Sequence, residues 1–251
     1  MLRRLDRLVL VGGLLIAAQL GFRAWALWGS WFYFDDLAFM SRAMNQPFDA
    51  GYLFESYGGH LMPAGFALAW VMTKWWVYDW APWAITLLLL QALASVGILR
   101  LLVSMFGRRP FVLVLLAAYL VWVFTLPAGL WWAAGINQLP LQVALGFGLT
   151  AFLAHLRTRR VRHLVVALVW VALGLLFYEK TVLVLGIYAV VALGWFTSGT
   201  TPQRLRGLWA QYRLAVVASA ALGAAYLAVY ARFGLDLGTG QTASVSWTSI
   251  A

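Results

Sequence analysis

The carboxylates that follow the first long apolar segment are the strongest candidates for chemistry in this chain. Asp35 and Asp36 come directly after four aromatic residues, Trp31 to Phe34. Adjacent carboxylates repel each other, so one of them tends to keep its proton or to bind a cation. Such a carboxylate can act as a general base, and a pair can hold a divalent metal ion. The structural alternative is that Asp35 caps a helix beginning at Asp36 and that both side chains face water.

A second group of polar residues follows within the same segment. Glu55 and His60 flank a short stretch with two glycines, which can fold back over the acidic pair. His60 is a candidate metal ligand or proton carrier, the alternative being a surface histidine without a role. If a divalent cation such as Mg²⁺ or Mn²⁺ is bound, the predicted ligands are Asp35, Asp36, Glu55 and His60.

Glu179 and Lys180 are the only charged residues in the apolar stretch from Leu164 to Phe196. One helix of this length would measure about 50 Å, which is too long for a single membrane crossing. The chain must therefore turn near this pair, and each arm is then only about 22 Å long, shorter than the hydrocarbon core. Ionisable residues at such depth are functional candidates, the alternative being a plain ion pair at a tight hairpin.

Two further features could bind a ligand. The stretch from Pro127 to Gln138 is predicted to be an outer turn. Its aromatic rings and side-chain amides suit a sugar ring, although interfacial loops also contain such residues. The residues concerned are Trp131, Trp132, Asn137 and Gln138. Arg23, near the end of the first apolar segment, is a candidate cation for an anionic ligand.

The composition indicates whether the chain is surrounded by water or by lipid. The chain is 64% hydrophobic and only 10% charged, and its mean hydropathy is +0.84. That much apolar surface requires lipid to cover it. The net charge of +10 does not indicate a nucleic-acid partner, because most of the arginines fall in short loops between apolar segments. The predicted partner is therefore the lipid bilayer.

The apolar segments predict an all-α, polytopic membrane protein with about seven spans. The predicted spans are Leu8 to Trp28, Ala81 to Phe106, Pro110 to Leu126, Leu139 to Leu156, Leu164 to Phe177, Thr181 to Phe196 and Leu214 to Ala231. This arrangement places most of the basic residues on one side and nearly all acidic residues on the other, which predicts a cytoplasmic N-terminus and an outer C-terminus. The first segment is predicted to be a retained span rather than a signal peptide, since it continues past Arg23.

The predicted domain organisation is one transmembrane module over 1–231 and a polar outer tail over 232–251, which could be the start of a further region. The module contains an aromatic-rich outer loop over 29–80. Two interfacial helices are expected in this loop, one from Asp36 to Met44 and one from Pro63 to Trp76, the second with proline at its first position. We expect the protein in the inner (plasma) membrane.

This combination of a first span, an outer loop with an acidic pair and two interfacial helices, and further spans resembles the class C (GT-C) integral-membrane glycosyltransferases. The resemblance covers roughly Leu8 to Ala231 and rests on topology together with the acidic pair, Glu55, His60 and the Glu179–Lys180 turn. It implies transfer of a sugar from a polyprenyl-phosphate donor to an acceptor hydroxyl at the outer face, with inversion.

The resemblance also implies roles. Asp35 or Asp36 would be the general base, and Lys180, or else Arg23, would meet the donor phosphate. The remaining candidates, Glu55, His60, Glu179 and the four residues of the Trp131–Gln138 stretch, would bind substrate. Some members of the superfamily hold a divalent metal with the loop acids. Members usually continue into more spans or a soluble domain, so this chain would be part of a longer protein or would work with a partner subunit.

Two other classes of function remain open from the sequence. A non-catalytic subunit or assembly factor of a membrane complex needs the same scaffold without the chemistry. A transporter or lipid flippase often shows inverted repeats and broken helices, and we find no such repeat. Because nearly all acidic residues gather on one side rather than along a path through the membrane, the sequence favours chemistry at the outer surface.

Overall fold

A computed structural model of the protein describes residues 7–123 and 126–234. Within these ranges the chain forms helices and loops without a β-strand, which confirms the all-α prediction. Four helices are long and apolar enough to cross a membrane: α1 (Arg7–Trp28), α5 (Trp80–Phe106), the continuous helix Trp132–Thr158 and α12 (Thr201–Phe233). Three shorter apolar helices accompany them: α6 (Phe111–Leu120), α10 (Val161–Leu175) and α11 (Leu183–Trp195).

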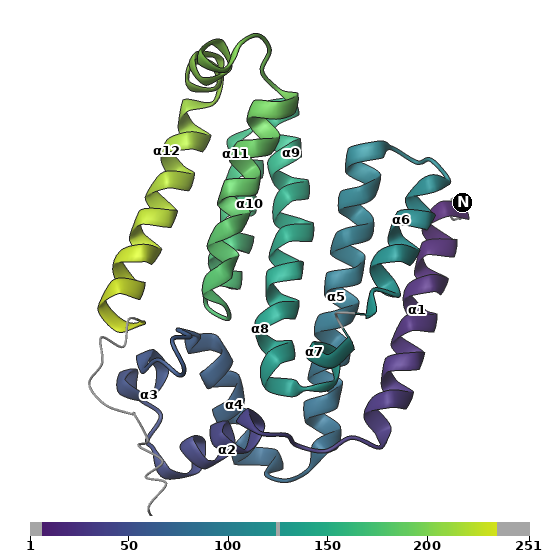
Figure 1. The fold of residues 1–251 in the computed structure, drawn as a ribbon, viewed down its shortest axis with the longest axis vertical. Coiled ribbons are helices and arrows are strands. Elements are labelled where there is room, and N and C mark those ends of the chain that lie inside the picture. The colour runs from purple at the N-terminus through teal and green to yellow at the C-terminus, as the bar shows by residue number, and fades with distance from the viewer. Residues whose placement is uncertain (1–6, 124–125, 235–251) are drawn as a thin grey trace, which may run out of the picture.

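The arrangement separates a helix bundle from a layer of short helices at one end. In Figure 1 the N-terminal end of α1 and the α5–α6 and α11–α12 connections lie at the upper end of the bundle. The short helices α2 (Asp35–Asn45), α3 (Ala50–Phe54) and α4 (Pro63–Trp76) lie across the lower end. The arginine-rich connections and the acidic loop are therefore at opposite ends. The predicted tail over 232–251 falls mostly outside the described residues.

Both helices predicted within the acidic loop are present. The bounds of α4 are those predicted, and α2 extends the predicted helix by one residue at each end. Asp35 is the first residue of α2 rather than its cap, so the structural alternative in which Asp35 caps the helix does not hold. Phe34 occupies the cap position without a side-chain hydrogen bond, and the Asp36 carboxylate accepts a hydrogen bond from the Tyr33 amide, 3.0 Å away.

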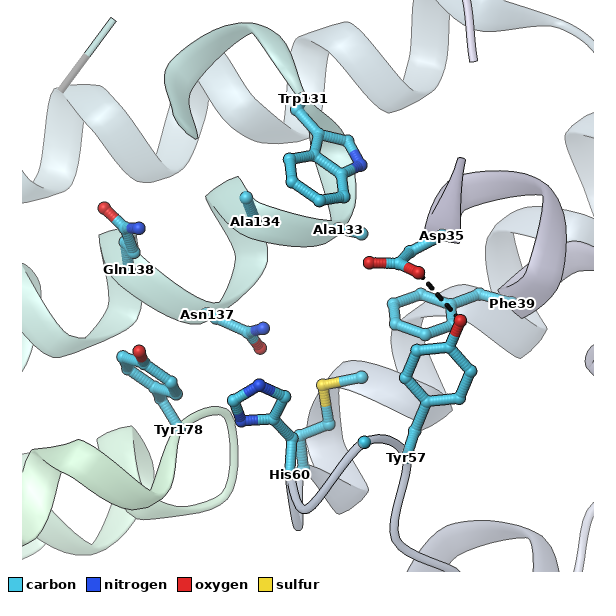
Figure 2. A pocket seen from close by; sticks show the side chains of 12 residues that line it. Asp35, Phe39, Tyr57, His60, Trp131, Ala133, Ala134, Asn137, Gln138 and Tyr178 are labelled. Atoms are coloured by element: carbon cyan, nitrogen blue, oxygen red, sulfur yellow. Dashed lines mark hydrogen bonds between the residues drawn. The ribbon is translucent and has the colours of Figure 1, made fainter. Parts of the chain in front are cut away.

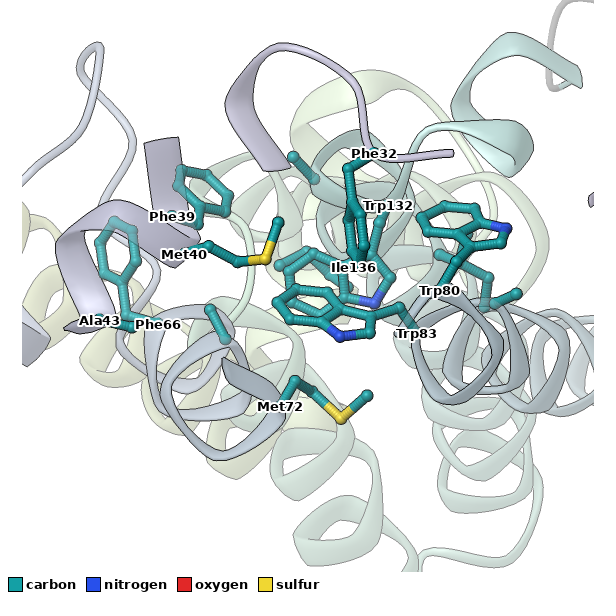
Figure 3. Packing of buried hydrophobic residues seen from close by; sticks show 14 of the residues in the cluster. Phe32, Phe39, Met40, Ala43, Phe66, Met72, Trp80, Trp83, Trp132 and Ile136 are labelled. Carbon is teal, nitrogen blue, oxygen red and sulfur yellow. The ribbon is translucent and has the colours of Figure 1, made fainter. Parts of the chain in front are cut away.

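A cluster of aromatic residues joins this layer to the bundle (Figure 3). The Phe32 ring meets Trp80 and Trp83 edge-on, with centroid distances of 5.1 and 5.2 Å. Trp83 in turn packs against Trp132 at 4.5 Å, and both are fully buried. Each ring removes a large apolar area from solvent, so the cluster fixes the layer against α5 and the start of the continuous helix. Trp132 is thus a core residue, and its predicted contact with substrate was wrong.

The continuous helix consists of α8 (Trp132–Val143), a π-helical turn η2 (Ala144–Gly148) and α9 (Leu149–Thr158). Pro140 lies inside α8, where it cannot donate a backbone hydrogen bond, and the wider turn follows directly. The turn crosses α5 at very close range, because a Cβ on Gly146 would lie 2.5 Å from the Gly97 carbonyl carbon. Such backbone contact is typical of small residues at helix crossings in membranes.

Two predicted connections differ from the structure. The third predicted span ends early, because α6 stops at Leu120. The predicted outer turn from Pro127 to Gln138 is instead helical, formed by α7 (Leu126–Leu130) and the start of α8. Trp132 in this stretch is buried against Trp83 of α5.

The turn predicted at Glu179 and Lys180 is present. The helix α10 ends at Leu175, one 3₁₀ turn η3 (Glu179–Val182) follows, and α11 begins at Leu183. The amide of Ala64, at the start of α4, donates a 2.9 Å hydrogen bond to the carbonyl of Leu176. The turn therefore rests directly on the layer that carries the acidic pair.

Candidate functional site

A cavity of about 300 Å³ lies where the layer, α8 and the α10–α11 turn meet (Figure 2). Five predicted site residues line it, contributed by three separate segments of the chain: Asp35, His60, Trp131, Asn137 and Gln138. Tyr57 and Tyr178 also line it and were not predicted. Residues far apart in the sequence thus form one polar cavity at the end of the bundle that carries the acidic residues.

Asp36 does not face this cavity but anchors the segments that form it. One carboxylate oxygen accepts the Tyr33 amide at 3.0 Å, and the other accepts the Ala133 amide at 2.8 Å. The side chain is fully buried, and burial raises the pKa of its carboxyl to about 6, although the backbone hydrogen bonds oppose this shift. Asp36 therefore ties the start of α2 to the start of α8.

This anchor places Asp35 in the cavity. Phe34, just before it, has φ 44° and ψ −101°, a conformation that a bulky residue rarely adopts. Such strain costs about 1–3 kcal/mol and persists only where the surroundings enforce it. Successive side chains on a helix point about 100° apart. With Asp36 directed into the core, Asp35 is directed into the cavity.

Tyr57 holds the Asp35 carboxylate. Its hydroxyl donates a 2.7 Å hydrogen bond to Asp35 Oδ1, drawn as a dashed line in Figure 2. Burial, followed by the hydrogen bond to Asp35, raises the pKa of Tyr57 to about 12. Tyr57 therefore stays protonated and acts as a donor, which orients one carboxylate oxygen and leaves the other available to a ligand.

A tight turn keeps Tyr57 beside His60. The two residues exchange backbone hydrogen bonds of 3.0 and 2.9 Å. Between them Gly58 and Gly59 have φ values of 56° and 81°, as a two-residue turn with both central residues in the left-handed region requires. Glycine is the residue that adopts this conformation most readily. The glycines that suggested flexibility in the sequence form a defined turn.

His60 pairs with Glu179 from the α10–α11 turn. Its Nδ1 lies 2.9 Å from Glu179 Oε1, and its side chain is 37% exposed whereas that of Glu179 is 16% exposed. Figure 2 shows the imidazole beside Asn137 and Tyr178, inside the cavity. An imidazole whose Nδ1 is held by a carboxylate keeps Nε2 free for a ligand. This contact connects residues that are 119 positions apart in the chain.

Two residues that line the cavity carry a buried polar atom without a hydrogen-bond partner in the described part of the chain: Trp131 (Nε1) and Asn137 (Oδ1). Oε2 of Glu179, whose other oxygen holds His60, also has none among the described residues. Buried polar groups are nearly always paired, and leaving one unpaired costs about 1–3 kcal/mol. Here the lining of the cavity offers one donor and one acceptor that are unpaired. Their arrangement suits a ligand with several hydroxyl groups.

Besides Asp36, four predicted residues do not take part in the cavity. Glu55 forms an exposed ion pair with Arg42, at 3.2 Å. Lys180 is exposed and lies just outside, with its Nζ 5.2 Å from the Tyr178 ring centroid. Arg23 lines a different cavity of about 510 Å³ against α6 and α7. Trp132, the fourth, is in the core.

The predicted metal site is not assembled. Asp36 uses both oxygens on backbone amides, and Glu55 is paired with Arg42, away from His60. Within residues 7–123 and 126–234, no three histidine, cysteine or acidic side chains are grouped as metal ligands. Mg²⁺ and Mn²⁺ favour carboxylate-rich sites, and the described residues do not offer one.

An apolar cavity of about 500 Å³ lies between α11 and α12. Small and aliphatic side chains from both helices line it, among them Leu185, Ala189, Ala220, Gly223 and Leu227. Val182, at the end of the η3 turn, also lines this cavity, so one end of the cavity lies close to Glu179 and Lys180. Comparison of the chain with protein-family models, with curated proteins and with solved structures finds no match.

Proposed function

We propose that the protein is an integral-membrane glycosyltransferase that takes a sugar from a polyprenyl-phosphate donor and transfers it to an acceptor hydroxyl. The observation that carries this proposal is the cavity that combines Asp35, which is held by Tyr57, with the unpaired polar atoms of Trp131 and Asn137. A carboxylate beside a ring-stacking indole and an amide provides a base and a sugar site together.

The proposed orientation places this cavity at the outer face of the inner membrane. The four long helices and the shorter α6, α10 and α11 would together give about seven crossings. The arginine-rich ends would face the cytoplasm, as the positive-inside rule favours. The layer formed by α2 and α4 would then lie in the outer interface.

In the proposed reaction Asp35 accepts the proton of the acceptor hydroxyl. The acceptor oxygen attacks the anomeric carbon of the donor sugar, and a new C–O bond forms as the bond between that carbon and the phosphate oxygen breaks. The electron pair of the broken bond leaves with the polyprenyl phosphate. Trp131, Asn137 and Gln138 would hold the sugar ring, with their polar atoms supplying the hydrogen bonds.

The leaving phosphate gains one negative charge, which requires a nearby positive group. Lys180, just outside the cavity, supplies this positive charge, and His60, held by Glu179, lies within the cavity. We assign the phosphate to the space between these two side chains. The apolar cavity between α11 and α12 continues from the same turn and suits the first isoprene units of the lipid.

The test uses the purified protein in lipid nanodiscs with a panel of polyprenyl-phosphate sugars. We expect one donor to bind and turn over, and Lys180→Ala to weaken its binding about tenfold, the loss of about 1.4 kcal/mol. Lys74→Ala is the matched control, because Lys74 is also exposed but lies at the end of α4, against Trp70. If no donor binds, or if both lysine variants behave alike, the transferase assignment fails and a non-catalytic subunit becomes the better interpretation.

A further inference from the structure

A second and much larger cavity adjoins the first. It has a volume of about 1560 Å³ and lies between α2, α3 and the C-terminal end of α12. The two cavities share Asp35, Tyr57 and Gly58. Asp35 therefore stands at the junction of two spaces, a small one bounded by His60 and Asn137 and a large one open along α2.

The lining of the large cavity is mixed, and a large part of it is polar. The face of α2 contributes Ser41, Asn45 and Gln46, and the connection after α3 contributes Glu55 and Ser56. Their hydroxyl and amide groups both donate and accept hydrogen bonds, and the carboxylate accepts them. The surface differs from the cavity between α11 and α12, which is lined almost entirely by apolar side chains.

Aromatic and cationic groups line the rest of the cavity. The Phe54 ring from α3 contacts the Phe233 ring from α12, with centroids 5.6 Å apart, and this contact joins the layer to the last long helix. Arg232 also lines this side, and Phe34 lies near the junction with Asp35. Flat rings beside hydrogen-bonding groups provide stacking surfaces for sugar faces.

The wall of the cavity is firmly fixed. Arg42 donates to the carbonyls of Tyr52 and Glu55, pairs with the Glu55 carboxylate at 3.2 Å and lies 4.0 Å above the Phe66 ring centroid. This network ties the 46–55 connection to α2, so the width of the cavity is set in the absence of a ligand. A preformed site binds without the cost of ordering its walls.

We propose that this large cavity binds the acceptor, and that the acceptor is a hydrophilic glycan chain whose terminal hydroxyl reaches Asp35. This inference rests on the proposed transferase function and names its second substrate. The volume exceeds the range of about 300–1,000 Å³ usual for small-molecule sites, which favours a chain of several sugar units. The hydroxyl groups on every unit match the hydroxyl and amide groups of the lining, and the sugar faces match its aromatic rings, whereas a lipid acceptor would require a wall as apolar as that of the cavity between α11 and α12.

The test places a bulky side chain in the large cavity without touching the small one. Ser41 is exposed and lines the large cavity, whereas Met44, on the same helix and 52% exposed, does not. Ser41→Trp and Met44→Trp are therefore matched variants, and surface positions of this kind tolerate substitution. The probes are linear heptasaccharides of glucose and of mannose, a serine- and threonine-rich peptide and a short-chain lipid alcohol, each titrated against the full chain in nanodiscs by native mass spectrometry.

We expect a heptasaccharide to bind the wild-type protein, Ser41→Trp to weaken that binding about tenfold or more, and Met44→Trp to leave it unchanged. Binding of the polyprenyl-phosphate donor should be equal in all three proteins. The inference is overturned if only the peptide or the lipid alcohol binds, if no probe binds, or if Ser41→Trp binds the heptasaccharide like the wild type. Failure of the donor to bind while Ser41→Trp still abolishes glycan binding would refute the transferase and leave the glycan site standing.

Discussion

Replacing Asp35 by asparagine removes the proposed base and little else. Asparagine has nearly the same shape and keeps an oxygen that can accept the 2.7 Å hydrogen bond from Tyr57. The cavity walls and the strained backbone at Phe34 do not depend on the charge of this side chain. The variant should fold like the wild type and bind the donor within about threefold of its affinity.

The expected loss of turnover follows from the proposed role of Asp35 as the general base. Proton transfer by a positioned base contributes about 10²–10⁴-fold, so kcat of Asp35→Asn should fall by that factor, which corresponds to about 2.7–5.5 kcal/mol of activation free energy. The assay is release of polyprenyl phosphate in single-turnover mixtures of protein, donor and acceptor, which separates chemistry from binding.

Asp36→Asn is the adjacent control. The amide retains one acceptor oxygen and leaves one of the two backbone N–H groups of Tyr33 and Ala133 unpaired, a cost of about 1–3 kcal/mol. It also removes a buried charge whose cost, for a pKa raised from 3.8 to about 6, is about 3 kcal/mol at neutral pH. These two effects offset each other, so Asp36→Asn should remain folded and lose less than about tenfold in kcat.

The assignment of Asp35 as the general base is refuted if Asp35→Asn keeps turnover within a few-fold of the wild type. It is also refuted if Asp36→Asn, shown to be folded by its thermal transition, loses turnover as completely as Asp35→Asn. In that case the carboxylate that the structure buries would be the chemical group.

Three further predictions concern stability and the donor phosphate. Because burial raises the pKa of Asp36 from 3.8 to about 6, the folded protein holds more protons than the unfolded chain between these pH values; stability should therefore fall as the pH rises from about 4 to 6, by up to about 3 kcal/mol. The Tm measured at pH 4.5 and 7.5 should lose this difference in Asp36→Asn, and an unchanged difference would show that another group titrates. Gly146→Ala should lower Tm because its Cβ would lie 2.5 Å from the α5 backbone, at a cost of about 1–3 kcal/mol, whereas Gly13→Ala meets nothing within 4 Å and should leave Tm unchanged or slightly higher. Glu179→Gln and His60→Gln should each weaken donor binding by about three- to tenfold, as measured by titration in nanodiscs; equal weakening of a donor analogue without the phosphate would contradict this assignment.

The helices of this fold were predictable where local signals are strong. Pro63 begins α4 as expected for proline at a first helical position, and Asp79, whose side chain accepts the Ala81 amide, precedes α5. The turn at Glu179 followed from length alone, since one helix could not accommodate the apolar stretch. These features depend on neighbours in the sequence.

The Trp131–Gln138 stretch was predicted incorrectly because its structure depends on distant partners. The stretch lies between two predicted spans, which favoured a turn, and nothing in the local sequence shows that Trp132 packs on Trp83. Trp132 also donates a 2.8 Å hydrogen bond from its indole to the Thr86 hydroxyl of α5. With this contact, Trp132 begins a long helix where a turn was predicted. Trp132 is therefore a core residue and not the predicted ligand contact.

The different roles of Asp35 and Asp36 also depend on a distant residue and could not be predicted from the local sequence. The sequence singles out two adjacent carboxylates but treats them alike, and repulsion between them suggested a shared proton or a shared metal ion. On one helix, adjacent side chains point about 100° apart, so the two carboxylates face different surroundings as soon as α2 forms. What assigns them is the Ala133 amide, 97 positions further along the chain, which donates a 2.8 Å hydrogen bond to Asp36. Once Asp36 is committed to that amide, Asp35 is the carboxylate that remains for a ligand, and a cation shared between the two is no longer a geometric option.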